Sequence, residues 1–135
     1  MLTRSLISSI FLVLLTAYGT AKSCQADDDA DVYATKIKPM FRERCFSCHG
    51  ALKQESNLRL DSVDLMVRGG DSGSIIVRGD SSMSLLLDRV TATDIALRMP
   101  PEHEGEALTS EQIDLLRHWI DQGAHAPEGE QPEPD

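Results

Sequence analysis

The feature that most constrains this chain is the pentapeptide Cys45-Phe46-Ser47-Cys48-His49. Two cysteines at this spacing form a disulfide, a redox-active pair or half of a zinc site. A structural zinc site needs a second pair of Cys or His ligands, and the sequence contains no second cluster. A thioredoxin-like pair follows a β-strand, whereas the residues before Cys45 have helical spacing. Both of these alternatives are therefore disfavoured.

The histidine directly after the second cysteine points to a different chemistry. C-x-x-C-H is the attachment signature of c-type haem. In that chemistry the thiols of Cys45 and Cys48 add to the vinyl groups of the haem, and the imidazole of His49 binds the iron. We therefore expect one covalently attached haem c per chain. A disulfide beside a surface histidine remains the alternative.

Residues 1–26 are typical of a secretory signal peptide. Arg4 provides the positive start, Leu6–Leu15 provide the apolar stretch, and small residues lead toward cleavage near Ala21 or Ala26. An apolar run of about ten residues is shorter than the roughly 20 residues that span a bilayer. We therefore expect export to the periplasm and no transmembrane anchor in the mature chain. Attachment to a membrane through a lipidated Cys24 is the alternative.

The composition of the 135 residues limits the partners. With 41% hydrophobic and 26% charged residues the chain is typical of a globular protein, and its length suits one domain. The formal net charge of −9 argues against binding to nucleic acid, which requires a basic surface, and favours basic protein partners. Aromatic residues make up only 4% of the chain, which suggests that another group helps to fill the core.

The sixth ligand of the iron determines the function, because a Met/His pair suits electron transfer and an open position suits ligand binding. Met99 is the best candidate. It precedes Pro100-Pro101, which cannot continue a helix and keep the preceding residue extended, so the side chain is presented from a stiff loop. His103 is the rival and would give iron with two histidine ligands.

The other methionines and histidines have ordinary interpretations. Met40 lies on the helix that leads into the motif, where we expect it to pack. Met66 and Met83 belong to short apolar runs, in which Met most often fills a core. We expect His118 on the surface of the last helix and His125 in solvent.

Hydrophobic spacing in the first half of the chain predicts short helices. The first helix covers about residues 31–45, with a kink or a late start at Pro39, which lacks a backbone N–H. Apolar and polar residues alternate over residues 58–60, which predicts a short extended segment. Asp61-Ser62 is placed to cap a helix that continues through Val67 and ends at Gly69-Gly70.

The second half begins with the apolar triplet 75–77, which suits a strand or a loop that covers the haem. Asp80-Ser81-Ser82 then caps a helix. Residues 109–112 match a capping box, with Leu108 and Ile113 as its hydrophobic staple, at the start of a last helix that ends before Gly123. We expect an all-α domain over residues 27–127 and a disordered, acidic and Pro-rich tail over residues 128–135.

Several motifs together resemble the Planctomycete-type cytochrome c domain over roughly residues 32–127. The matching segments are Ile37-Lys38-Pro39, Cys45 to Gly50, Leu58 to Asp61, Gly69 to Gly73, Val77 to Asp80, Ser84-Leu85-Leu86, Met99-Pro100-Pro101, and the stretch from Leu108-Thr109 to Gly123-Ala124. The resemblance implies a class I cytochrome c fold, in which the first and last helices cross and the haem lies between them. It also implies that Cys45 and Cys48 form the thioethers, that His49 is the proximal ligand and that Met99 is the distal ligand.

These features favour an electron carrier over an enzyme. The expected partners are a donor and an acceptor protein that exchange electrons with the haem. The alternative is a haem module that binds a ligand or acts like a peroxidase, with a distal site that is open or occupied by His103. Trp119 suits an electron relay, or simply packing where the helices cross.

Overall fold

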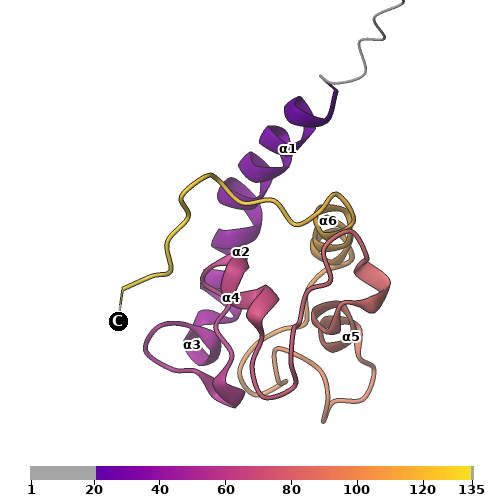
Figure 1. Ribbon diagram of the computed structural model, residues 1–135. Coiled ribbons are helices and arrows are strands. Elements are labelled where there is room, and N and C mark those ends of the chain that lie inside the picture. The colour runs from indigo at the N-terminus through magenta and orange to yellow at the C-terminus, as the bar shows by residue number, and fades with distance from the viewer. Residues whose placement is uncertain (1–20, 135) are drawn as a thin grey trace, which may run out of the picture.

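The computed structural model describes residues 21–134, and its regular elements are all helices (Figure 1). The all-α prediction is confirmed for this part of the chain, in which the only β-type pairs are two isolated bridges. The elements are α1 (Ala21–Val32), the π-helical η1 (Tyr33–Ile37), α2 (Lys38–Arg44), α3 (Phe46–His49), the 3-10 turn η2 (Glu55–Asn57), α4 (Val63–Arg68), the 3-10 turn η3 (Ser81–Met83), α5 (Leu85–Thr91) and α6 (Ser110–Asp121).

The signal peptide predicted for residues 1–26 lies mostly outside the described residues. Within residues 21–134, no helix is long and apolar enough to cross a membrane.

The N-terminal helical segment begins earlier than the predicted start near residue 31. α1, η1 and α2 follow one another without a break, and α1 extends away from the body of the molecule (Figure 1). Pro39, in the first turn of α2, has no N–H with which to continue an α-helical ladder. Directly before it, the N–H of Lys38 donates to the carbonyl of Tyr33, five residues earlier. The π turn accommodates the proline where a kink is expected from the sequence.

α4 confirms the predicted cap and stop. The Ser62 hydroxyl accepts a hydrogen bond from the N–H of Leu65, and the helix ends at Gly69 with φ 74°. A side chain at Gly69 would also place its Cβ 1.7 Å from the carbonyl oxygen of Gly73. Both the positive φ and the close approach require glycine at this position.

The helix predicted after Asp80 is shorter in the structure. The Asp80 carboxylate accepts from the N–H of Met83 and caps the 3-10 turn η3, and α5 begins only at Leu85. Met83 therefore lies at the end of a surface turn and is 69% exposed, so the prediction that it fills the core is wrong. Residues 75–77 form no strand, and Ile75 and Ile76 are buried in the core.

α6 packs against the N-terminal helix. Thr109 and Gln112 form the predicted capping box. The buried Trp119 ring stacks on Tyr33, with ring centres 5.1 Å apart, and its Nε1 donates to the carbonyl of His125. Trp119 therefore packs against the N-terminal helix, which is one of the two roles that the sequence analysis gives for it. The His125 side chain is half-buried rather than solvated.

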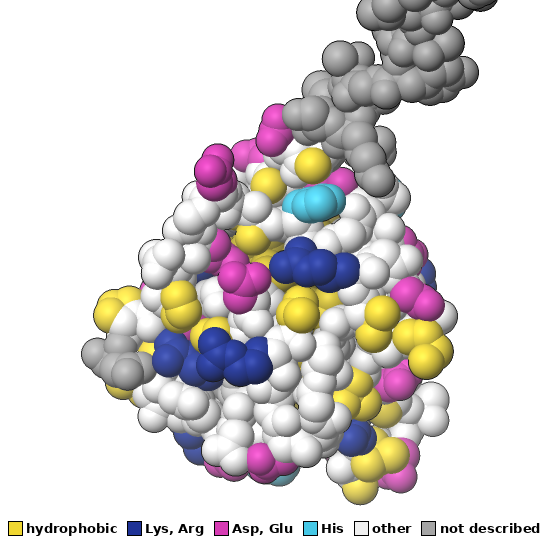
Figure 2. Space-filling view, in the orientation of Figure 1, with side chains coloured by type: hydrophobic (Ala, Val, Ile, Leu, Met, Phe, Trp, Pro, Cys, Tyr) yellow, Lys and Arg dark blue, Asp and Glu magenta, His cyan; other side chains and the backbone are white. Residues whose placement is uncertain are grey.

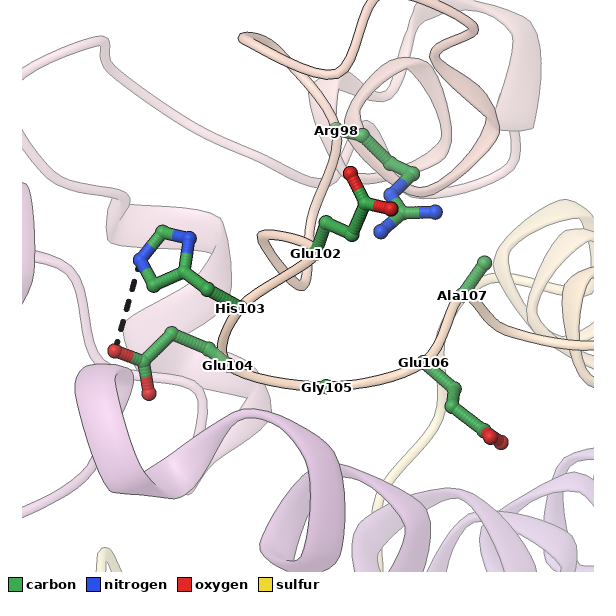
Figure 3. Close-up of a pocket in the computed structure, with 7 residues that line it drawn as sticks. All are labelled: Arg98, Glu102, His103, Glu104, Gly105, Glu106 and Ala107. Carbon is green, nitrogen blue, oxygen red and sulfur yellow. Dashed lines mark ion pairs between the residues drawn. The ribbon is translucent and has the colours of Figure 1, made fainter.

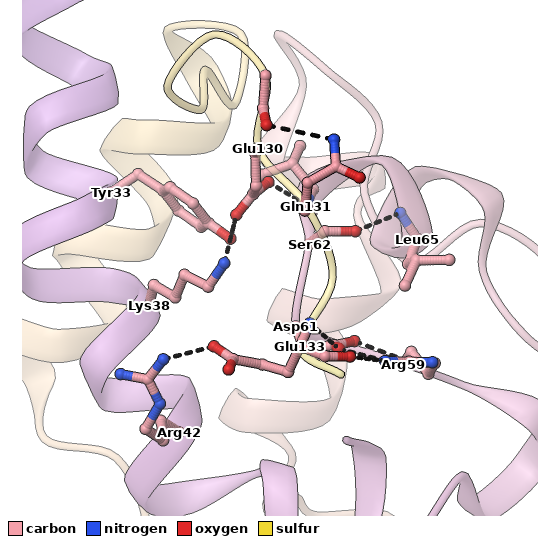
Figure 4. A network of polar contacts seen from close by, with 12 residues as sticks. Tyr33, Lys38, Arg42, Arg59, Asp61, Ser62, Leu65, Glu130, Gln131 and Glu133 are labelled. Atoms are coloured by element: carbon pink, nitrogen blue, oxygen red, sulfur yellow. Dashed lines mark hydrogen bonds and ion pairs between the residues drawn. The ribbon is translucent and has the colours of Figure 1, made fainter. Parts of the chain in front are cut away.

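The C-terminal tail, residues 127–134, differs from the disordered segment expected from its composition. It leaves α6 and crosses the N-terminal helix (Figure 1). The Glu130 carboxylate accepts hydrogen bonds from the Tyr33 hydroxyl at 2.7 Å, from Lys38 Nζ at 2.8 Å and from the N–H of Val63 at 2.9 Å (Figure 4). One side chain thus joins η1 and α2 to the start of α4.

Glu133 makes the second anchor of the tail (Figure 4). Its N–H donates to Asp61 Oδ2 at 2.9 Å, its carbonyl accepts from Arg59 at 2.9 Å, and its carboxylate pairs with Arg42. Asp61 is 0% exposed and forms two hydrogen bonds with the Arg59 guanidinium. Lys and Arg side chains also lie along the face that the tail crosses (Figure 2).

The Asp61 network makes folding stability depend on pH. Burial alone raises the pKa of Asp61, but hydrogen bonds from Arg59, from its own N–H and from that of Glu133 together outweigh burial and lower the pKa. The stabilisation is therefore present above the unfolded-state pKa of about 4 and is lost as pH falls through the lower folded-state pKa. Asp61→Asn should be less stable than wild type at pH 7, and its stability should fall less between pH 5 and pH 2.

Urea denaturation at a series of pH values measures this difference. Asp64→Asn is the matched control, because the Asp64 side chain is 92% exposed. An unchanged pH slope in Asp61→Asn would contradict this account of the network.

Candidate haem-binding site

A cavity of about 530 Å³ lies beside α3 and α5. Ligand sites in proteins typically enclose about 300–1,000 Å³. The cavity brings together all five candidate residues of the sequence analysis, namely Cys45, Cys48, His49, Met99 and His103. Much of the remaining wall is apolar, from Leu58, Leu60, Ile75, Leu85, Leu86, Val90 and Leu97. An apolar wall around a few ligating groups suits a large hydrophobic ring.

The cysteine motif forms a single turn at the end of α2. The N–H of Cys45 donates to the carbonyl of Phe41, and the N–H of His49 donates to the carbonyl of Cys45, both at 2.8 Å. Cys45 is thus the C-cap of α2 and the N-cap of α3. These bonds fix the sulfur atoms and the imidazole at neighbouring points of the cavity wall.

Both cysteines of the motif are free and half-buried. Burial raises the pKa of Cys45 to about 12, and the nearby Arg44 only partly opposes it. Reactive redox cysteines have lowered pKa values, because the thiolate is the reactive form. The environment of Cys45 therefore does not match that of a thioredoxin-like pair.

His49 is placed as a neutral imidazole. Burial lowers its pKa, although the carbonyl groups of Glu55 and Leu58 interact with the ring and favour the charged form. Despite these neighbours, its Nδ1 is buried and makes no hydrogen bond of good geometry. A neutral imidazole is the form that binds a metal. The residues of this wall thus fit a haem whose iron is bound by His49.

Met99 and His103 both reach the cavity from the loop after α5. The N–H of Met99 donates to the carbonyl of Arg89 at 2.9 Å, which ties this loop to α5, and the Met99-Pro100 peptide is cis. Met99 is 36% exposed, whereas the His103 side chain is 81% exposed and lies 3.8 Å from the Glu104 carboxylate. Met99 is the better covered of the two.

A shallower hollow of about 550 Å³ lies next to the cavity, on the loop from Arg98 to Ala107 (Figure 3). It is open to solvent and lined mostly by charged side chains. His103 and Glu104 point to one side of this loop, and Arg98 and Glu102 lie on another (Figure 3). This hollow contains neither Cys45 nor Cys48, whereas the deeper cavity contains both. Any chemistry of the cysteine motif therefore belongs to the deeper cavity.

The remaining candidates lie elsewhere. Met40 and Met66 are buried in the core, as expected, and His118 is exposed on α6. None of these three lines the cavity.

The structure separates the three basic residues near the motif. Lys38 and Arg42 bind the C-terminal tail. Arg44 lines the cavity, and its buried Nε lies 3.5 Å from the Glu43 carboxylate without a hydrogen bond. The sequence analysis selected neither Arg44 nor Arg89, which lines the cavity from α5. The position of Arg44 directly before Cys45 is the sequence feature that could have indicated its place in the cavity wall.

A comparison with protein families identifies this part of the chain. The model of the family described as Planctomycete cytochrome C matches residues 45–103. These residues are similar to that family. The matched stretch begins at Cys45 and ends at His103, so it includes every candidate residue of the cavity. Similarity to a cytochrome c family implies haem c and suggests electron transfer. No curated protein and no solved structure matches the chain.

The glycine after the motif yields a prediction. A Cβ on Gly50 would lie 2.5 Å from the carbonyl oxygen of Phe46, so α3 would have to shift. Gly50→Ala should destabilise the folded protein by roughly 1–3 kcal/mol, the usual cost of overpacking. Urea denaturation measures this loss.

Gly105→Ala is the control, since its Cβ would meet only the Pro100 side chain at an ordinary 3.7 Å. Equal stability of the Gly50→Ala and Gly105→Ala proteins would show that the turn tolerates a side chain.

Proposed function

We propose that this protein is a monohaem c-type cytochrome that carries electrons between partner proteins in the periplasm. The observation that carries the proposal is the cavity, whose wall combines the Cys45–His49 turn with Met99. Cys45 and Cys48 hold the haem through thioethers, in which each S–H adds across one vinyl group and nothing leaves. His49 is the proximal ligand and Met99 the distal ligand.

The residues of the cavity have distinct tasks in this proposal. The haem supplies the change between Fe(II) and Fe(III). His49 donates its neutral imidazole, and the soft thioether of Met99 raises the reduction potential and closes the distal position. The apolar side chains keep water from most of the ring, which also affects the potential. Such a closed site suits an electron carrier better than an enzyme.

The surface of the protein favours basic partners. The chain carries a formal charge of −9, and a charge of this size steers encounters with proteins of opposite sign. At the cavity, the apolar side chains of Leu97 and Met99 are partly exposed. On the face shown in Figure 2, hydrophobic side chains reach the surface among charged ones.

A second candidate function rests on His103, which also lines the cavity. With His103 at the distal position, or with that position open, the protein would bind a small ligand or act like a peroxidase. Rapid binding of carbon monoxide by the reduced wild-type protein would favour this candidate.

The distal ligand can be tested by substitution. The oxidised haem protein should show the weak long-wavelength absorption band of iron bound to a methionine sulfur. Met99→Ala should lose this band and bind carbon monoxide readily when reduced, because one coordination position opens. His103→Ala is the control and should keep the band. A Met99→Ala protein with the wild-type spectrum would contradict the assignment of Met99.

The covalent attachment can be tested on a denaturing gel stained for haem. In cells that attach haem to c-type cytochromes, the wild-type band should stain, and Cys45→Ser combined with Cys48→Ser should abolish the stain. Cys24→Ser, outside the motif, should stain as the wild type does. Equal staining of the double variant would show that the two thiols do not hold the haem.

A further inference from the structure

Haem brings two negative charges that the wall of the cavity must accommodate. Its vinyl groups and its propionate carboxylates lie on opposite edges of the ring. Attachment through Cys45 and Cys48 puts the vinyl edge at α3, so the propionate edge faces the part of the wall that lies away from the cysteines. A carboxylate beside an apolar pocket needs a cationic or hydrogen-bonding partner, because burial of an unpaired charge costs free energy.

Most charged side chains of the cavity wall already have a charged or polar neighbour. They form the pairs Lys53–Glu55 at 3.0 Å, Asn57–Asp71 at 2.6 Å and His103–Glu104 at 3.8 Å. Outside the Cys45–His49 turn, the remaining ionisable residues of the wall are Arg44 and Arg89. These two arginines are therefore the cationic candidates for the propionates.

The two arginines lie at different parts of the wall. Arg44 directly precedes Cys45, at the vinyl edge, and its Nε already lies 3.5 Å from the Glu43 carboxylate. Arg89 lines the cavity from α5, which lies well apart from α3 in the fold (Figure 1). Within residues 21–134 the half-buried Arg89 side chain has no hydrogen-bond or ion-pair partner. Arg89 thus combines an uncompensated charge with the position that the propionate edge requires.

The main chain of Arg89 ties this position to the distal side of the cavity. Its carbonyl accepts the N–H of Met99 at 2.9 Å. Its neighbour Val90 is buried and lines the same cavity. Arg89 therefore faces the cavity with its side chain while its main chain holds the loop that carries Met99. A contact from this side chain to the haem would join α5, the Met99 loop and the edge of the ring.

We propose that Arg89 binds a propionate of the haem through its guanidinium group. This inference rests on the proposed function. The guanidinium is planar and forms two parallel hydrogen bonds with a carboxylate, which makes Arg better suited than Lys to this contact. An opposite charge within about 4–6 Å favours the ionised form of a carboxyl group and lowers its pKa by about 1–3. This effect on the propionate can be measured directly.

The test labels the propionates of the attached haem. Cells that attach haem c and cannot make 5-aminolevulinate are supplied with this precursor carrying ¹³C at its carboxyl carbon, so that both propionate carboxyl groups become labelled. ¹³C NMR of the reduced full chain over a pH titration then gives the pKa of each propionate. Arg89→Gln removes the cation and keeps a polar side chain. Arg44→Gln is the matched control, because it removes a cation from the same wall.

We expect Arg89→Gln to raise the pKa of one propionate by about 1 or more, because the ionised form loses its partner. Arg89→Lys keeps the charge but not the planar fork, so it should give a smaller rise. This variant decides the matter if Arg89→Gln does not fold. Arg44→Gln should keep the wild-type values of both propionates.

Two results would overturn the inference. One is a set of wild-type propionate pKa values in both Arg89 variants. A loss of stability without a change in these values would mean that the cation serves only the C-terminal end of α5, in whose last turn it lies. The other is an equal rise in Arg44→Gln. A wild-type protein without covalently bound, labelled haem would instead contradict the proposed function itself, so the two failures are distinguishable.

Discussion

The hydrogen-bonded turn from Cys45 to His49 is the constraint on which the rest of the structure depends. The carbonyl of Cys45 accepts the N–H of His49, and the carbonyl of His49 accepts the N–H of Leu60. The first bond sets where the two sulfurs and the imidazole lie, and the second aligns the extended segment beside them. The cavity is then closed by α5 and the loop that carries Met99, which are far away in the sequence.

Local chemistry in the sequence was enough to predict much of the fold. The capping box at Thr109 and the cap and stop of α4 are contacts between residues a few positions apart, so short patterns reveal them. Met83 shows the limit of this approach. Its apolar run looks like one helix, but Asp80 closes a separate turn first and leaves the methionine on the surface.

The docking of the tail was beyond the sequence patterns. Pro and Glu together are typical of disorder, because such a segment has little apolar surface to bury. Here Lys38 and Arg42, four residues apart on one helix, meet Glu130 and Glu133, three residues apart in the tail. That match joins segments about ninety residues apart, and no local rule reports it.

The sequence was enough to predict the ligating residues of the candidate site, but not all of the residues that line its cavity. Cys45, Cys48 and His49 follow from the motif, and the cavity contains them together with Met99 and His103. The sequence did not reveal Leu58 as a neighbour of His49, nor Arg44 and Arg89 as wall residues. Their positions depend on how separate segments pack around the cavity.

The mass of the intact mature protein tests the central claim most directly. The protein should be produced in cells that attach haem to c-type cytochromes and measured under denaturing conditions, after extraction with acidified organic solvent has removed any haem that is not covalently held. The account predicts the mass of the polypeptide plus one haem. The mass of the polypeptide alone, with the thiols of Cys45 and Cys48 free to react, would contradict it.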